Sequence, residues 1–274
     1  MADLSDPRVA VYIDFDNIVI SQYDNVHGRG LFIKEKARTG AGKTAERLAQ
    51  ADVNIGAVLD YASSFGAVAI SRAYADWSSP ANNRYQKKLV DRAIDLVQLF
   101  NTSGTKNGAD IRLAIDVTED LFRLQDISHI VIVAGDSDYI PLAQRARRLG
   151  RTVIGIGVKG SSSAAFMSAC DEFTYYNDLP GTEPIVAPPV EAEPDPARDA
   201  TELLVRALRV GRPDNSDNWL DASALKTQMK RLEPGFDEKK LGAKSFTDFV
   251  KSRGDVVELQ EDGQVRKVRL RERG

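Results

Sequence analysis

Histidine and cysteine are scarce in this sequence, and their scarcity limits the chemistry that it can carry. The 274 residues include one cysteine, Cys170, and two histidines, His27 and His129. A single cysteine excludes an internal disulfide framework and a cysteine zinc cluster, and it fits a reducing compartment. A Ser-His-Asp or two-histidine mechanism would have to use these histidines, and neither has a suggestive local setting. Carboxylates are therefore the favoured catalytic groups.

Long apolar runs are also missing. No segment approaches the apolar length that spans a bilayer, so we expect no membrane partner. Residues 1–7 are acidic and lack an apolar core, which argues against a signal peptide and favours a cytoplasmic location. The net charge is -3, so the chain is no general polyanion binder, and any nucleic-acid contact must come from a local basic patch.

Composition indicates a soluble globular chain, and the length suggests two domains or one large one. It is 42% hydrophobic and 28% charged, which is ordinary for a globular protein. Residues 182–197 read TEPIVAPPVEAEPDPA, a segment with five prolines and no apolar period. We expect a first domain at residues 1–181, a linker at 182–198 and a second domain at 199–274.

The first domain alternates between strand and helix patterns. Continuous apolar runs predict buried strands, and apolar residues at helical spacing predict helices. Residues 24–44 are interpreted as a basic, glycine-containing loop. We expect strands at residues 9–13, 67–74, 96–100, 130–134 and 153–158, and helices at 43–65, 82–94, 110–124, 141–149 and 162–170. This order predicts an α/β fold, a parallel sheet with helices on both faces.

Four aspartates follow strands of this predicted sheet. Asp14 follows the first strand, Asp110 follows the strand at 96–100 and its loop, and Asp136 and Asp138 follow the strand at 130–134. The carboxyl ends of parallel strands meet at one edge, where such sheets bind ligands. Clustered carboxylates repel one another, and Mg²⁺ or Mn²⁺ would relieve that repulsion. The pattern therefore favours metal-assisted phosphodiester hydrolysis.

Helix capping is the competing interpretation of these acids. An aspartate after a strand often caps the next helix, as Asp136-Ser137-Asp138 would before Pro141. For any single acid, capping explains the sequence as well as catalysis does. For four acids at the same edge of the sheet, capping alone is the weaker explanation. Asp116 lies about 240° around the helix from Asp110, which leaves a supporting role or polar surface.

Three ordered segments carry a family resemblance. They are YIDFDN at residues 12–17, KNGAD at 106–110 and VAGDSDY at 133–139. Together they resemble the signature segments of the NYN domain, the LabA-like branch of the PIN-like nucleases, over nearly all of residues 8–178. The resemblance implies a Rossmann-like parallel sheet and a metal-dependent ribonuclease, with Asp14, Asp110, Asp136 and Asp138 as its acidic site.

The same segments contain residues for supporting roles. Asn17 matches the family's asparagine, and it would orient Asp14 or bind a metal-bound water, or else cap a turn. Asp116 and Ser137 are the other supporting candidates. Phe15 stands where many members have glycine, which would narrow the approach to Asp14. Lys106 is a candidate phosphate contact or a solvated lysine in a glycine-rich loop.

A second motif competes for the functional assignment. Residues 37–44, ARTGAGKT, fit a relaxed phosphate-loop pattern, but the stricter form begins with glycine, and no convincing strand precedes it. A P-loop nucleotide-binding protein is therefore a minor alternative. In the leading interpretation Arg38 and Lys43 guide an RNA backbone, or belong to a solvated loop. Trp77, just past a strand end, is the best candidate for stacking on bases.

The second domain combines helices with a hairpin. Helical patterns cover residues 200–210, 222–232 and 239–253, and two alternating runs flank Asp262-Gly263. Three helices and a hairpin suggest a small winged-helix domain. The segments at 219–225, 234–237, 241–242 and 244–249 resemble the OST-HTH, or LOTUS, domain. The resemblance implies RNA as partner, including G-rich structured RNA, and in some relatives a helicase.

Charge also distinguishes the second domain. Residues 198–274 carry 17 basic and 14 acidic residues, a net charge of +3, and the rest of the chain is at -6. Lys240, Lys244 and Lys251 are the predicted RNA contacts of this domain, and a solvated helix face is the alternative. A non-catalytic RNA-binding regulator is the main rival to the ribonuclease hypothesis, and cleavage of DNA is a third possibility.

Overall fold

The computed structural model describes residues 7–100, 108–182, 196–211, 218–263 and 265–271. The chain divides into two compact units, residues 1–186 and 187–274. The predicted linker, residues 182–198, falls largely outside the described residues. Within the described ranges no helix has the length and apolarity that a bilayer crossing requires.

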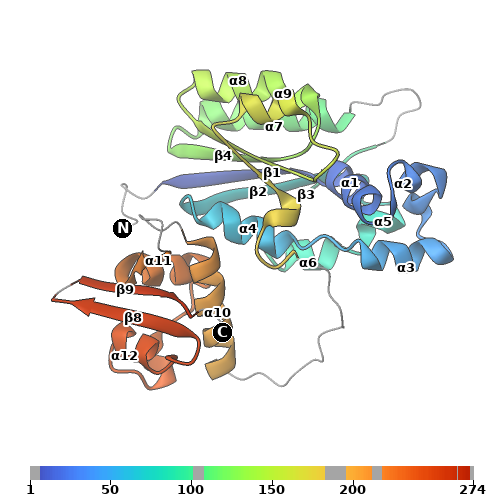
Figure 1. Ribbon diagram of the computed structural model, residues 1–274. Helices are drawn as coiled ribbons and strands as arrows, with labels where there is room; N and C mark the ends of the chain where they lie inside the picture. The colour runs from blue at the N-terminus through green and yellow to red at the C-terminus, as the bar shows by residue number, and fades with distance from the viewer. Residues whose placement is uncertain (1–6, 101–107, 183–195, 212–217, 264, 272–274) are drawn as a thin grey trace. The chain divides into compact units, whose positions relative to one another are not determined.

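A six-stranded parallel sheet organises the first unit (Figure 1). Its order, β3-β2-β1-β4-β5-β6, reverses between β1 and β4. Every neighbouring pair runs parallel. The strands are β1 (Arg8–Asp14), β2 (Ala67–Ala75), β3 (Asp95–Gln98), β4 (Ile127–Val133), β5 (Thr152–Gly157) and β6 (Glu172–Tyr175). The predicted parallel sheet is thus confirmed, and β6 is an addition to it.

Helices cover both faces of this sheet, as predicted (Figure 1). Side chains of β1 alternate between the faces, with Val11 in one core and Tyr12 in the other, because successive residues of a strand point oppositely. One face carries α7 (Gly108–Arg123), α8 (Ile140–Arg148) and α9 (Ala164–Ala169). The other carries α1 (Phe15–His27), α3 (Lys43–Gln50), α4 (Ile55–Ser63), α5 (Pro80–Asn83) and α6 (Gln86–Val90).

The largest error of the sequence prediction lies between β1 and α3. The expected loop begins within α1, and α2 (Leu31–Lys34) and the 3-10 helix η1 (Ala37–Thr39) follow. Asp14 starts α1 by accepting a hydrogen bond from the Asn17 backbone N–H at 3.0 Å. Ile18, Val19 and Tyr23 are buried on one side of α1, a helical spacing that the β-branched residues conceal.

The single helix predicted at 43–65 is two helices in the structure. Asn54 starts the second, α4, by accepting from the Ala57 N–H. Asn54 is held in place from outside the helix, because its backbone N–H donates to the Tyr176 hydroxyl at 2.7 Å and its side chain donates to the Gly181 carbonyl at 2.8 Å. The break before α4 at Asn54 is therefore stabilised by partners more than 120 positions away in the sequence.

The second unit is a small domain of helices and a three-stranded antiparallel sheet, β7-β9-β8. The third predicted helix, 239–253, is divided because Gly242 adopts a left-handed conformation (φ 80°) and Ser245 caps a new helix. The elements are α10 (Pro196–Val210), β7 (Leu220–Asp221), α11 (Ala222–Leu232), the 3-10 helix η4 (Glu238–Leu241), α12 (Phe246–Lys251), β8 (Val257–Asp262) and β9 (Val265–Leu270).

Candidate active site

Asp14 is the most deeply buried of the four predicted acids. It ends β1 in the middle of the sheet and is 3% exposed. Its Oδ1 accepts from the backbone N–H of Asn17 at 3.0 Å, and its Oδ2 accepts from the hydroxyl of Tyr139 at 2.8 Å. Asp14 therefore caps α1, as the capping interpretation expects, and it also faces a second element, the 3-10 helix η2 (Ser137–Tyr139).

Burial changes the acidity of Asp14. Desolvation raises the pKa of its carboxyl to about 7, because the charged form loses hydration. The hydrogen bonds from Asn17 and Tyr139 oppose this rise, and the negative charges of Asp110 and Asp16 add to it. Near neutral pH a nearby cation would therefore stabilise the charged form of this buried carboxyl.

Asp110 meets Asp14 from the other side. It lies in the first turn of α7 and is half-buried. Desolvation raises the pKa of its carboxyl, and the charges of Asp136 and Asp138 raise it further, while hydrogen bonding to Tyr139 and Asp14 acts in the opposite direction. The structure thus brings β1, α7 and η2 together around these carboxyls.

Asp136 and Asp138 stand at the rim of this group. Both are exposed, and they flank Ser137 at the start of η2. Asp136 accepts from the Asp138 backbone N–H at 3.4 Å and from the Ser137 hydroxyl at 3.3 Å. The capping role weighed from the sequence is therefore present in Asp136. The same two acids are close enough to raise the pKa of Asp110.

Asn17 connects the two halves of the sheet. Its backbone N–H donates to Asp14, and its side-chain oxygen accepts from the backbone N–H of Gly135 at 3.2 Å. Gly135 belongs to the loop that follows β4, so Asn17 ties this loop to the start of α1. Of the three expected roles, orienting Asp14 is carried out by the backbone N–H of Asn17, and its side chain instead binds the loop after β4.

The donor chemistry fits a hard divalent cation. Carboxylate oxygens are the ligands that Mg²⁺ and Mn²⁺ favour, and Mg²⁺ often uses one or two carboxylates with several waters. Within the described residues, no group of three or more His, Cys, Asp or Glu side chains is placed to bind one ion together. The buried Asp14 and the half-buried Asp110 are therefore the part of the site whose donor chemistry fits a metal.

A second polar group beside the site was not anticipated. Asp16 accepts from the side chain of Asn82 at 2.7 Å and from the backbone N–H of Asp76, just past β2, at 3.2 Å. The guanidinium of Arg38 pairs with Asp16 at 3.5 Å and with Asp76 at 3.7 Å. Asp16 follows Asp14 by two positions, which was the one signal in the sequence.

The predicted RNA contacts of the first domain have different outcomes. Arg38 is half-buried between two acids, whereas Lys43 is exposed at the first position of α3. Lys106 lies outside the described residues. The prediction for Trp77 is wrong: its ring is buried against Phe15, with centroids 5.1 Å apart, and its Nε1 donates to a backbone carbonyl. A buried indole does not present a face to a base.

Asp116 belongs to a separate buried row on the same face of the sheet. The Tyr74 hydroxyl donates to Asp116 at 3.1 Å, and Arg112 pairs with it at 3.0 Å. In the same way the Tyr12 hydroxyl donates to Asp120 at 2.8 Å. These contacts tie α7 to the central strands, so Asp116 acts in packing, and no described contact joins it to Asp14.

The phosphate-loop alternative lacks its structural setting. A phosphate loop follows a buried strand and opens a helix, with its backbone N–H groups turned to the ligand. Here the helix α2 precedes residues 37–44, and η1 occupies their first part. The structure therefore contradicts the P-loop interpretation.

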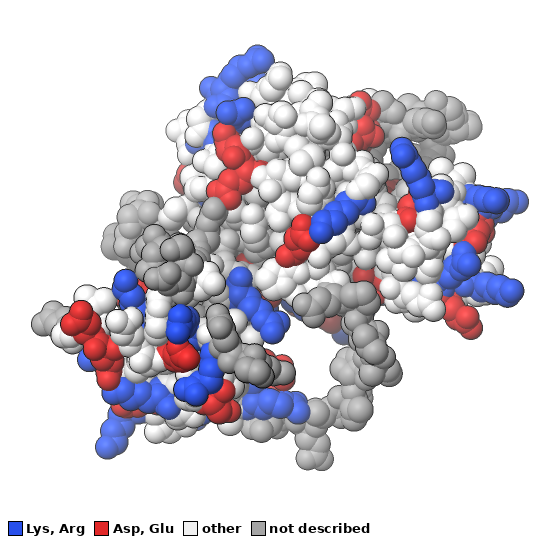
Figure 2. Space-filling model, viewed as in Figure 1, with Lys and Arg blue, Asp and Glu red and all other residues white. Residues whose placement is uncertain are grey.

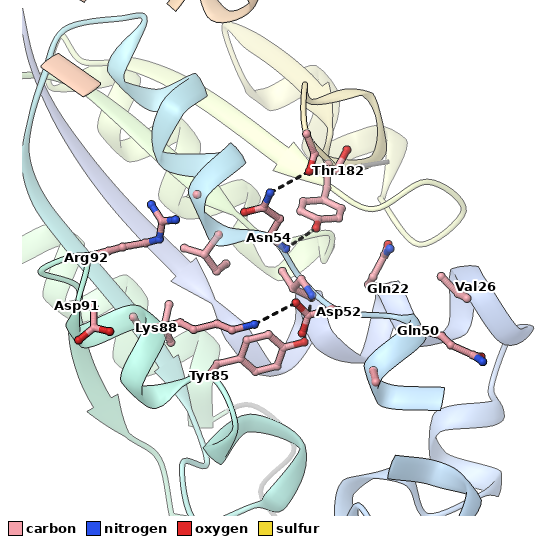
Figure 3. A pocket seen from close by; sticks show the side chains of 17 residues that line it. Gln22, Val26, Gln50, Asp52, Asn54, Tyr85, Lys88, Asp91, Arg92 and Thr182 are labelled. Carbon is pink, nitrogen blue, oxygen red and sulfur yellow. Dashed lines mark hydrogen bonds and ion pairs between the residues drawn. The ribbon is translucent and has the colours of Figure 1, made fainter. Parts of the chain in front are cut away.

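A large cavity lies away from the acids. It has a volume of about 930 Å³ between α1, α4 and α6, and its lining includes Gln22, Asp52, Tyr85, Lys88 and Arg92 (Figure 3). Asp52 pairs with Lys88 and with Arg84. The hydroxyl of Tyr85 accepts from the backbone N–H of Val53 at 3.0 Å. Asp52 and Asn54 therefore have polar partners within the lining, and none of the four predicted acids lines the cavity.

The basic residues of the second unit are mixed with acids. Lys251 pairs with Glu261 at 2.9 Å, whereas Lys240 and Lys244 are exposed on and after η4. Figure 2 shows Lys and Arg side chains interspersed with Asp and Glu on the visible face of this unit. The Arg269 guanidinium lies 4.6 Å from the centre of the Trp219 ring, a cation–π contact.

Two known domain families match the two units of this chain. Residues 8–178 match the NYN domain, and residues 194–269 match the OST-HTH/LOTUS domain. The uncharacterized protein MJ0482 of Methanocaldococcus jannaschii is 28% identical over 120 residues, which are 44% of this chain and 46% of that protein. The chain thus covers less than half of this relative's length.

A solved structure also matches part of this chain. The crystal structure of a protein of unknown function, VPA0982 from Vibrio parahaemolyticus, covers 65% of this chain and 98% of its own at 18% identity, with a TM-score of 0.48. The NYN match covers more than half of the sequence, including Asp14, Asp110, Asp136 and Asp138. The chain therefore belongs to the NYN domain family of PIN-like nucleases and carries an OST-HTH/LOTUS domain after its NYN domain.

Proposed function

We propose that this protein is a metal-dependent ribonuclease, with Mg²⁺ or Mn²⁺ as cofactor. The observation that carries the proposal is the pair of Asp14 and Asp110, buried and half-buried carboxyls that meet at the carboxyl edge of the NYN sheet. Among the described residues, no lysine or arginine forms an ion pair with either acid. Repulsion between them is the kind of cost that a bound cation removes.

The residues have distinct roles in this proposal. Asp14 and Asp110 would hold the cation, and the exposed Asp136 and Asp138 would add negative charge at the rim. A bound Mg²⁺ or Mn²⁺ supplies polarisation of a water and of the phosphodiester. Asn17 fixes the orientation of Asp14. Ser137 supports Asp136 through its hydroxyl.

The OST-HTH/LOTUS domain would hold the RNA. Lys240 and Lys244 are its exposed basic candidates, and contacts of this kind would add affinity without reading sequence. Lys251 is engaged by Glu261 and is the weaker candidate. Binding of G-rich structured RNA or of a helicase by this domain stays a prediction of the resemblance.

Cleavage of labelled RNA and DNA pools in Mg²⁺, Mn²⁺ or EDTA tests the proposal. Asp14→Asn and Asp136→Asn should each abolish metal-dependent RNA cleavage and leave the far-UV circular dichroism unchanged. Asp95→Asn is the matched control, because Asp95 is exposed at the start of β3, on the opposite edge of the sheet. Full activity of either site variant in contaminant-free protein would refute the assignment.

A non-catalytic RNA-binding regulator is the second candidate. This alternative is favoured because, within the described residues, no three Asp, Glu, His or Cys side chains are placed together around one point. RNA binding without metal-dependent cleavage of any substrate would select it. Cleavage of DNA in preference to RNA would correct the substrate instead.

A further inference from the structure

The hydroxyl of Tyr139 occupies the centre of the acidic group. It donates to Asp14 Oδ2 at 2.8 Å, and hydrogen bonding with Asp110 also reaches it. The Asp14 Oδ1 is taken by the backbone N–H of Asn17. Both oxygens of Asp14 therefore have a fixed donor, which sets the rotation of the carboxylate plane. An unliganded carboxylate without these donors would rotate more freely about its χ2 torsion.

The tyrosine is itself held rigidly. Tyr139 is fully buried and is the last residue of η2, whose first turn is closed by Asp136. Its ring packs near Phe166 of α9, with centroids 6.3 Å apart. The hydroxyl position is thus set by the protein core, and it does not depend on a surface side chain.

We propose that Tyr139 is a positioning residue of the metal site, and that its hydroxyl presets Asp14 relative to Asp110 for cation binding. The inference rests on the proposed function, because it assigns a role toward the same cation. Residues that orient a metal ligand through a hydrogen bond raise metal affinity, since less ordering is needed on binding. The hydroxyl also partly compensates the burial of Asp14 before a cation arrives.

Comparable tyrosines on the same sheet provide the control. Tyr12, Tyr74 and Tyr139 are each buried, and each hydroxyl donates to an aspartate at about the same distance. The partners of Tyr12 and Tyr74 are Asp120 and Asp116, which lie further along α7 than the site acid Asp110. Tyr74→Phe therefore removes an equivalent buried tyrosine–aspartate hydrogen bond, and Tyr139→Phe removes the one that orients Asp14.

The test is isothermal titration of Mn²⁺ alone into the full chain. We expect Tyr139→Phe to weaken Mn²⁺ binding by about 10-fold to 100-fold, the usual loss when the partner of a metal ligand is removed. Tyr74→Phe should bind Mn²⁺ as the wild type does. In cleavage assays the Mn²⁺ concentration for half-maximal rate should rise for Tyr139→Phe, and the rate at saturating Mn²⁺ should be largely restored.

The outcomes separate the two proposals. If the wild-type chain binds no Mn²⁺, or if Asp14→Asn binds Mn²⁺ as well as the wild type does, the proposed function and this inference both fail. If the wild type binds Mn²⁺ and Tyr139→Phe binds it equally well, only the positioning role is overturned. Should Tyr139→Phe be too unstable for titration, the Mn²⁺-dependent shift of its unfolding free energy measures the same affinity. Phe166→Leu loosens the packing around the Tyr139 ring and keeps the Tyr139 hydroxyl. This variant should also weaken Mn²⁺ binding, but by a smaller factor than Tyr139→Phe.

Discussion

The acidic site and the cavity between α1, α4 and α6 both combine aspartates with buried tyrosines, but they differ in charge. The aspartate Asp52 of the cavity is paired with cations, whereas Asp14 of the site is not. In the cavity Asp52 has two cationic partners, and the Tyr85 hydroxyl accepts a hydrogen bond from the backbone. At the site the Tyr139 hydroxyl donates to Asp14, and no described cation pairs with that acid. Size favours the cavity as a site, whereas uncompensated charge favours the acids. The proposed function rests on the second criterion, the negative charge that no described cation compensates.

Stability in EDTA at different pH values gives the largest expected effect. The folded-state pKa of Asp14, about 7, lies above its ordinary value of 3.8, so the contribution of this carboxyl to stability should be lost as the pH rises from 4 to 8. By linkage this loss is up to about 4 kcal/mol. Asp14→Asn has no such group, so it should be more stable than the wild type at pH 8 and nearly equal at pH 4.

Urea unfolding at each pH measures this difference. Asp95→Asn, with its exposed carboxyl, should follow the wild-type profile. An Asp14→Asn variant that is less stable than the wild type at pH 8 would show that the buried carboxylate is compensated after all. The contrast between the site and the cavity would then lose its basis.

Metal addition gives the next effect. A cation that binds only the folded state should stabilise the wild type by about 2.7 kcal/mol at a hundredfold excess over its Kd. Asp14→Asn and Asp110→Asn should lose this gain, whereas Asp52→Asn should keep it, because Asp52 already has Arg84 and Lys88 as partners. Thermal unfolding with and without Mn²⁺ is the measurement. A loss of the gain in Asp52→Asn would instead place the cation in the cavity.

Removal of the Tyr85 hydroxyl gives the smallest effect. Tyr85→Phe leaves the backbone N–H of Val53 buried without its acceptor, which should cost about 1–2 kcal/mol of unfolding free energy. Mn²⁺ binding and RNA cleavage should not change, because the cavity is a structural junction in our interpretation. Calorimetry and a cleavage assay on the same preparation check both expectations. A strong loss of cleavage at unchanged stability would make the cavity part of the substrate path.

The sequence carried the architecture further than the details of the site. Buried strands with continuous apolar runs predicted the sheet, and the strand ends predicted where Asp14 and Asp110 would meet. The helix α1 was missed because Ile18 and Val19 resemble a strand locally, while only tertiary packing shows their helical face. The break before α4 depends on Tyr176 and Gly181, which no local pattern near Asn54 could reveal.

Side-chain partners were the hardest part to predict. Trp77 stands beside turn residues, which suggested exposure, yet its ring fills the core against Phe15. Tyr139 is the last residue of the VAGDSDY segment, and no role was predicted for it from the sequence. Its contact with Asp14 spans 125 positions and depends on the strand order. Contacts of this kind follow from topology, and periodicity cannot supply them.

The reversal of strand order between β1 and β4 has a consequence for how this protein can diversify. The loop after β2 lies on one side of the reversal, and the loops after β4 and β5 lie on the other. Asp14 and the Asn17–Gly135 hydrogen bond stand at the boundary between them. Insertions or exchanges on either side can therefore remodel one flank at a time, while Asp14 and its hydrogen-bonded neighbours keep their mutual placement. Under the proposed function, new substrate preferences would be accessible by changing one flank without rebuilding the centre.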